Sequence, residues 1–179
     1  MTSETRPLSK SLAELRREFD ATFAAPPQGQ GEGRESLITL RVGGEALAVR
    51  TLHITGVAKR RRIVPVPTHV PGLLGIMALR GALLPVYDLA TILKLPAAAG
   101  PGSWLMLIGR ETPVGLIFDE FESQMEVERA CLFESESSGQ RQHLRLVARL
   151  GTAHRAVIDI PGLVEEIRRT AGTLEPLKE

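Results

Sequence analysis

The chain has 179 residues, and its 22 Lys and Arg residues nearly balance 21 Asp and Glu residues. A net charge of +1 supplies no global field that would attract nucleic acid or an acidic membrane, and an aromatic content of 4% supplies few rings on which bases stack. The only cysteine, Cys131, excludes an internal disulfide and a cysteine-based zinc site, which fits a reducing cytoplasm. This length suits one domain or two small ones, with a core that needs no disulfide.

The N-terminal segment, residues 1–24, carries an apolar stripe of helical period. Its apolar residues recur every three or four positions: Leu8, Leu12, Leu15, Phe19 and Phe23. The segment lacks the apolar region of a secretory signal, and nowhere does the chain reach the ~20 consecutive apolar residues of a membrane span. A Gly/Pro-rich linker follows over residues 25–35. The stripe either packs on its own domain or serves as a tethered docking helix for a partner, and the sequence leaves both readings open.

From residue 36 the chain consists of short apolar segments separated by Gly and Pro, a pattern typical of strands. We expect a hairpin over residues 36–50 and a second hairpin over residues 103–121. The other expected strands are 51–58, 60–67, 73–79, 82–89, 122–130, 144–151 and 155–160. A loop over residues 94–102 divides this series, and a short helix over residues 160–170 closes it. Regular short strands predict an all-β barrel or sandwich rather than alternating β-α units.

Motifs of catalysis and of metal or cofactor binding are missing. The chain has no phosphate-binding loop, dinucleotide fingerprint or nucleophile elbow. Its histidines are His53, His69, His143 and His154, and no two are spaced as metal ligands on one helical turn. Asp119 and Glu120 are adjacent, so on a strand their carboxylates point to opposite faces. We expect no enzyme activity, no catalytic residue, no cofactor and no metal.

The strongest charge run is KRRR at residues 59–62. A solvated loop or strand edge that resists aggregation is the favoured interpretation. An anionic partner is the alternative, but four charges without interleaved aromatic rings are a weak signal for nucleic acid.

An arginine interrupts the most apolar part of the chain, residues 75–93. Gly81 permits a tight turn after it, and Pro85 restricts the next strand to an edge or to an outward-facing nitrogen. Asp88 is placed to cap the apolar run that follows. Arg80 then lies at a strand end, either in an intramolecular ion pair, for example with Asp88, or as an interface hot spot in apolar surroundings.

At this point the sequence resembles a known family. Residues 71–89, PGLLGIMALRGALLPVYDL, are similar to the signature of CheW-like chemotaxis coupling domains, in which Leu-Arg-Gly precedes Pro-Val-x-Asp-Leu. The preceding residues 47–75 fit the same family, residues 114–122 resemble its later strand, and residues 155–167 resemble its closing element. The resemblance covers roughly residues 36 to 167 in ordered blocks.

The resemblance implies an all-β fold of two SH3-like five-stranded β-barrels that share one core, with short flanking helices. The domain would span residues 36–170, with barrel halves at roughly 36–98 and 102–170 and a tail over residues 171–179.

The resemblance also implies a non-enzymatic coupling adaptor in a bacterial chemosensory array. Its expected partners are the cytoplasmic tip of a methyl-accepting chemoreceptor, in the groove between the barrels, and the regulatory domain of a CheA-type histidine kinase, on a barrel end. It would be cytoplasmic and recruited to membrane receptor arrays, with no nucleic acid bound and no direct membrane insertion.

Binding residues follow from the matched positions. The family's receptor-facing arginine falls on Arg80, between Leu79 and Gly81. Further contacts fall on Ile54, Gly56 and Val57 in one strand and on Asp119 and Phe121 in a later one.

Two departures bear on partner identity: Ala78 replaces the family's Asn, and Gly56 replaces its common Glu. The alternatives are therefore a divergent CheW-like protein that keeps only one of the two contacts, and a small-barrel nucleic-acid-binding module that uses residues 59–62.

Overall fold

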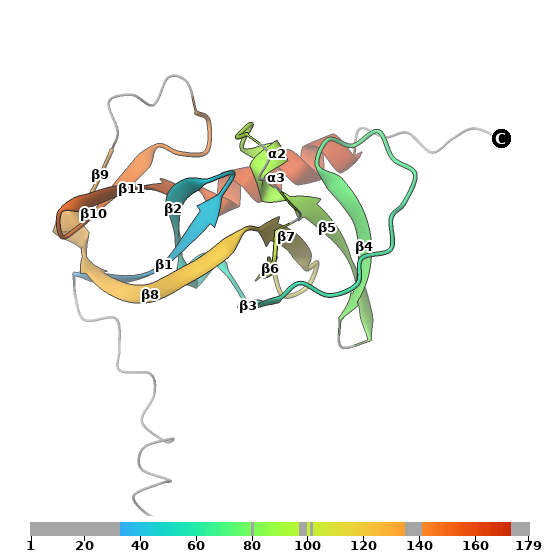
Figure 1. The fold of residues 1–179 in the computed structure, drawn as a ribbon, viewed down its shortest axis with the longest axis horizontal. Coiled ribbons are helices and arrows are strands. Elements are labelled where there is room, and N and C mark those ends of the chain that lie inside the picture. The colour runs from blue at the N-terminus through green and yellow to red at the C-terminus, as the bar shows by residue number, and fades with distance from the viewer. Residues whose placement is uncertain (1–32, 80, 97–99, 101, 135–140, 173–179) are drawn as a thin grey trace, which may run out of the picture. The chain divides into compact units, whose positions relative to one another are not determined.

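The structure is a computed structural model, and it describes residues 33–79, 81–96, 100, 102–134 and 141–172. The expected N-terminal helix, nearly all of the linker, Arg80 and most of the C-terminal tail lie outside the described residues. Within the described part, strands dominate and form two mixed sheets, with few and short helices (Figure 1). The all-β expectation is confirmed.

The first sheet has six strands in the order β8-β1-β2-β11-β10-β9. Its strands are β1 (Arg34–Val42), β2 (Glu45–Arg50), β8 (Glu120–Glu128), β9 (Leu132–Glu134), β10 (Leu146–Leu150) and β11 (Ala153–Ile158). The hairpin expected over residues 36–50 is the β1–β2 pair. All neighbours are antiparallel except β2 and β11, which come from opposite ends of the domain and run parallel.

The second sheet has five strands in the order β3-β6-β7-β5-β4. Its strands are β3 (Gly56–Lys59), β4 (Leu73–Leu79), β5 (Ala82–Asp88), β6 (Trp104–Ile108) and β7 (Val114–Phe118). The second expected hairpin is the β6–β7 pair, and β5 pairs with β7 in parallel. Two expected strands are shorter than expected: residues Thr51–His53 form a 3-10 turn, η1, and residues 60–67 make only one bridge, at Val64, because Pro65 and Pro67 offer no amide hydrogen.

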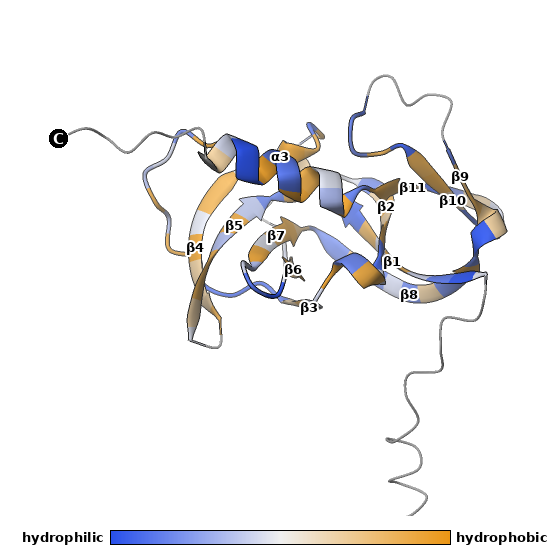
Figure 2. Ribbon diagram, turned by 180° about the vertical axis from the view of Figure 1, so that it is seen from behind, coloured by the Kyte–Doolittle hydropathy of each residue, from blue (hydrophilic) through white to orange (hydrophobic). Residues whose placement is uncertain are grey.

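The short helices are α2 (Leu89–Ile92), the 3-10 turn η2 (Arg129–Cys131) and α3 (Ile160–Gly172). Asp88 caps α2 as expected, because its carboxylate accepts a hydrogen bond from the Thr91 backbone N–H at 3.0 Å. α3 is amphipathic, with hydrophobic and hydrophilic residues alternating along its turns (Figure 2). Its buried residues recur at helical spacing: Ile160, Leu163, Val164 and Ile167.

Three apolar clusters hold the fold together. The largest contains residues of both sheets, α2 and α3, so the two sheets share one core. A smaller cluster lies inside the curl of each sheet, around Leu37 in the first and around Met77 in the second. The sequence of β7 is apolar throughout because both faces of the strand are buried. Leu116 faces the shared core, and Ile117, on the opposite face, belongs to the cluster inside the second sheet.

The structure corrects the expected division of the barrels. The first sheet combines β1 and β2 with β8 to β11, and the second contains β3 to β7. The division at residues 98–102 therefore falls within the second sheet, between β5 and β6, and does not separate the barrels. The parallel pairs β2–β11 and β5–β7 join segments distant in sequence, and turn signals cannot reveal such pairings.

Candidate protein-binding site

Four of the predicted binding residues line one groove beside the second sheet: Ile54, Gly56, Val57 and Leu79. The groove has a volume of about 640 Å³. Its other lining residues are Thr55, Ala58, Lys59, Arg61, Leu105, Leu107, Gly109, Arg110 and Pro113. We call this feature the seam groove.

The seam groove exists because the second sheet closes incompletely. β3 and β4 are its two end strands, and β3 pairs only with β6. The segment after β3 reaches β4 through a single bridge, in which Val64 and Ile76 exchange backbone hydrogen bonds of 2.8 and 2.9 Å. Nothing in the described pairing covers the outer edge of β3 itself, so its backbone groups are available to another chain.

The floor of the groove is apolar. Leu105 belongs to the interior cluster of the second sheet, and Leu79 and Leu107 pack against it. Gly56 has no side chain to cover them, and a Cβ added there would meet only Leu107 Cδ1, at 3.9 Å. The groove floor is therefore formed by Leu79 and Leu107 at the partly exposed margin of this cluster.

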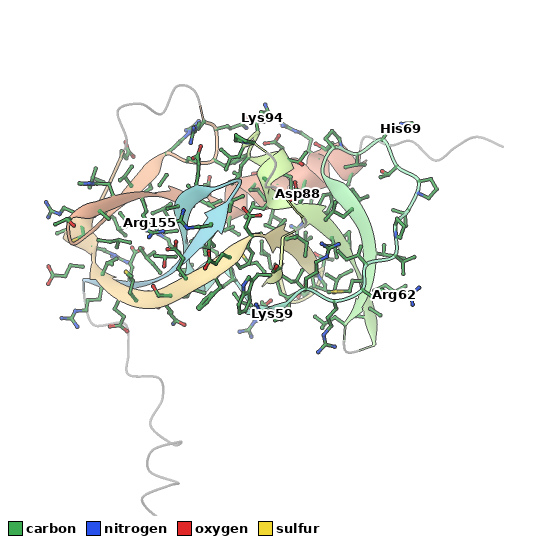
Figure 3. The ribbon with its side chains drawn as sticks, in the orientation of Figure 1. Lys59, Arg62, His69, Asp88, Lys94 and Arg155 are labelled. Carbon is green, nitrogen blue, oxygen red and sulfur yellow. The ribbon has the colours of Figure 1, made fainter. Side chains whose placement is uncertain are left out.

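The rim of the groove is basic. Lys59, Arg61 and Arg110 are exposed lining residues, and no described lining residue carries a carboxylate. Figure 3 shows Lys59 and Arg62 along the segment that runs from β3 towards β4. The charge run at residues 59–62 thus lies on an edge strand and the following loop, with all four side chains exposed.

Phe121 is connected to β3 through a tryptophan that the sequence analysis did not select. The rings of Trp104 and Phe121 have centroids 5.4 Å apart, and the Lys59 ammonium lies 3.8 Å from the centroid of the Trp104 ring. Both aromatic rings pack on the shared core. Trp104 is the only tryptophan of the chain, and that rarity is the sequence signal that would have identified it.

The remaining predicted residues lie apart from the groove lining. Gly81 is exposed in the β4–β5 turn with φ of +83°, as expected for a glycine that permits a tight turn. Asp119 is half-buried between β7 and β8, where its backbone N–H donates to the Arg41 carbonyl at 3.1 Å. Arg80 precedes Gly81 and follows Leu79, but it lies outside the described residues.

Two of the histidines, His143 and His154, make side-chain contacts within the fold. His143 Nε2 lies 2.5 Å from Glu166 Oε2, which links the segment before β10 to α3, and His154 makes an edge contact with the ring of Phe133. Among the described residues, no three His, Cys, Asp or Glu side chains form a group able to hold a metal ion. None of the described helices has the length and apolar content needed to cross a membrane.

Comparison with known proteins identifies the fold and the family. A family profile described as the CheW-like domain matches residues 36–168. The solved structure of the scaffolding protein TtCheW from Thermoanaerobacter tengcongensis is similar, with a TM-score of 0.63 and 17% sequence identity, over 70% of this chain and 88% of that chain. No curated protein sequence gives a significant match. The family match spans most of the chain and the two sheets share one core as in two SH3-like barrels, so the chain belongs to the CheW-like domain family.

Proposed function

We propose that the chain is a non-enzymatic coupling adaptor of a bacterial chemosensory array, which bridges a chemoreceptor tip and the regulatory domain of a CheA-type histidine kinase. The observation that carries this proposal is the seam groove, where Leu79 comes together with Ile54, Gly56 and Val57 although it lies more than 20 residues away from them in the sequence. Membership of the CheW-like domain family supports the same role.

The seam groove has the properties of a protein-docking surface. It combines an apolar floor, a charged rim and a free strand edge, and such edges bind partners by adding a strand. We assign it to the kinase regulatory domain, which in this family has the same fold and docks on a barrel end. The receptor tip is assigned to the face where Phe121 and Trp104 join the two sheets. Arg80, which matches the family's receptor-facing arginine in the sequence, is proposed as a further receptor contact.

A direct binding experiment tests the bridging role. The full chain is titrated separately with the kinase regulatory domain and with the receptor tip of the same organism, and the three are then mixed and separated by size exclusion. We expect two binary complexes and one ternary complex. Binding of one partner alone would establish the divergent adaptor that keeps a single contact, and binding of neither would overturn the proposal.

The nucleic-acid alternative is tested by a titration with single-stranded DNA at low salt. We expect no saturable binding, because the ring of Trp104 packs on the shared core and the Lys59 ammonium lies over the same ring, where a base would have to stack. Saturable binding with a steep salt dependence would favour the nucleic-acid module instead.

A further inference from the structure

We propose that the seam groove selects an acidic, extended segment of its partner, which places an apolar side chain over Gly56 and carboxylates against Lys59 and Arg61. This proposal rests on the proposed function, and it adds the chemistry of the partner. Three independent features of the groove support it: its floor, its rim and its free strand edge.

The floor accepts an apolar side chain. Leu79 and Leu107 pack on the interior cluster of the second sheet and also line the groove, so a side chain placed between them would extend an existing core. Gly56 and Ala58 leave the space above them open, because neither carries a large side chain. The Cβ position of Gly56 has only one neighbour within 4 Å, the Leu107 methyl carbon at 3.9 Å.

The basic side chains of the rim can form ion pairs with carboxylates of a partner. The described ion pairs of the protein use Arg41, Arg50, Arg129, Arg141, Arg155 and His143 as their cations. None of these pairs involves Lys59, Arg61 or Arg110, and no described carboxylate lines the groove. A partner segment that carried Lys or Arg would meet three like charges there, whereas an acidic segment would form ion pairs with them.

The free edge of β3 favours an extended conformation. β3 pairs only with β6, so one row of its backbone N–H and C=O groups has no strand partner in the described structure. A partner strand that pairs with this edge would place alternate side chains towards the groove floor and towards solvent. The result is one extended segment with apolar and acidic residues in alternation.

Lys59 supplies a spectroscopic readout. Its ammonium lies over the ring of Trp104, and the chain has no other tryptophan. A partner carboxylate that draws the Lys59 ammonium from the ring removes a cation from the fluorophore. We therefore expect the fluorescence of Trp104 to change during titration with a kinase regulatory domain that itself lacks tryptophan.

The decisive experiment compares Gly56→Gln with Gly56→Glu in the full chain. The two side chains have nearly the same shape, so the difference between the variants reports charge alone. We expect Gly56→Gln to weaken binding of the kinase regulatory domain by a few-fold through steric obstruction. We expect Gly56→Glu to weaken it by roughly a further tenfold through repulsion of the partner's carboxylates, and this difference to shrink at about 0.5 M salt.

A second pair of variants controls for folding and net charge. Arg61→Glu reverses an exposed rim charge, and Arg149→Glu makes the same change at an exposed position of β10 in the first sheet. We expect Arg61→Glu to weaken kinase binding about tenfold and Arg149→Glu to leave it within about twofold. Equal melting temperatures of both variants would show that the loss of binding is not a loss of fold.

The outcomes separate this inference from the proposed function. If the wild-type chain binds neither kinase nor receptor, the proposed function fails. If it binds the kinase but Gly56→Gln and Gly56→Glu are equally weak at low and high salt, the function stands and the acidic partner is wrong. Concentration-dependent self-association that Gly56→Glu abolishes would identify a second copy of the chain as the occupant and overturn the proposal.

Discussion

Arg155 and Glu122 form an ion pair in the interior of the first sheet, with 2.6 Å between Nη1 and Oε2, and both side chains are about four-fifths buried. Arg41 Nε approaches the other oxygen of the same carboxylate at 2.9 Å, so Glu122 joins β1, β8 and β11. Figure 3 shows Arg155 between β11 and β1. Arg155 Nη1 is buried and makes no well-directed hydrogen bond. The negative charge of Glu122 therefore offsets the cost of burying the Arg155 charge.

Replacing Glu122 with Gln should therefore destabilise the fold. The change leaves the largely buried Arg155 without its countercharge, and we expect the free energy of unfolding to fall by ~1–3 kcal/mol. Urea denaturation measures the loss. Glu122→Leu combined with Arg155→Met should recover part of it, because the partly buried charges at both positions are removed. A Glu122→Gln variant as stable as the wild type would show that these ion pairs add nothing measurable to the free energy of unfolding.

Neither fragment 36–98 nor fragment 102–170 should fold alone. The first lacks β8 and β11, which flank the β1–β2 hairpin, and also lacks β7, the partner of β5. The second lacks β1 and β2, which join β8 to β11. We expect collapsed amide spectra and rapid hydrogen exchange from each fragment, with recovery of dispersed signals when both are mixed. Dispersed, protected amides in either isolated fragment would contradict the shared core.

Removal of residues 1–32 should leave the fold stable. The first strand begins at Arg34, and Glu35 accepts ion pairs from Arg50 and Arg129, so the cut must stop before these residues. We expect the melting temperature of the shortened chain to stay within about 3 °C of the full chain, a change below ~1 kcal/mol. A larger loss would mean that the apolar stripe of residues 8–23 packs on the sheets.

Arg80→Ala should reduce partner binding without loss of stability. Arg80 lies between Leu79 and Gly81 in the sequence, and the apolar Leu83 nearby in the chain is exposed, so Arg80 is a hot-spot candidate. We expect its truncation to cost ~1–3 kcal/mol of binding free energy. Arg80→Glu should bind more weakly still. Melting and binding are measured on the same sample, with both partners. Lost stability with unchanged binding would assign Arg80 to an intramolecular ion pair.

The stability of the fold should depend on pH through His53. Burial lowers the pKa of His53 from its usual 6.5, and the Arg50 charge lowers it further, against smaller opposing effects of Asp159 and Glu35. The unfolded chain therefore binds more protons just below pH 6.5, so stability is complete above that pH and falls as the pH drops through the lowered pKa. Melting curves from about pH 7.5 to 5 should show a shallower fall for His53→Gln than for the wild type. The exposed His69→Gln is the control, and equal slopes in all three proteins would contradict the assignment.

The local structure of this protein could be predicted from its sequence. Short apolar segments separated by turn residues predict the β1–β2 and β6–β7 hairpins, Asp88 is the cap of α2, and Gly81 lies in the turn that it was expected to permit. These features depend on neighbours within a few residues, so their signals lie in short stretches of sequence. The resemblance to the CheW-like family predicted two features that the local patterns did not: the two-barrel fold, and a set of binding residues on separate segments of the chain.

Only the tertiary structure decided which strands are neighbours and what lies between them. The parallel pair β2–β11 assigns the first and last described strands to one sheet. The parallel pair β5–β7 joins strands on either side of residues 98–102 in the other sheet, against a division there. The same folding brings Leu79 and Gly56 into one groove and puts the Trp104 ring in contact with both Lys59 and Phe121. Contacts between distant segments form because burying apolar surface outweighs the entropy of closing long loops, and no local pattern records which surfaces meet.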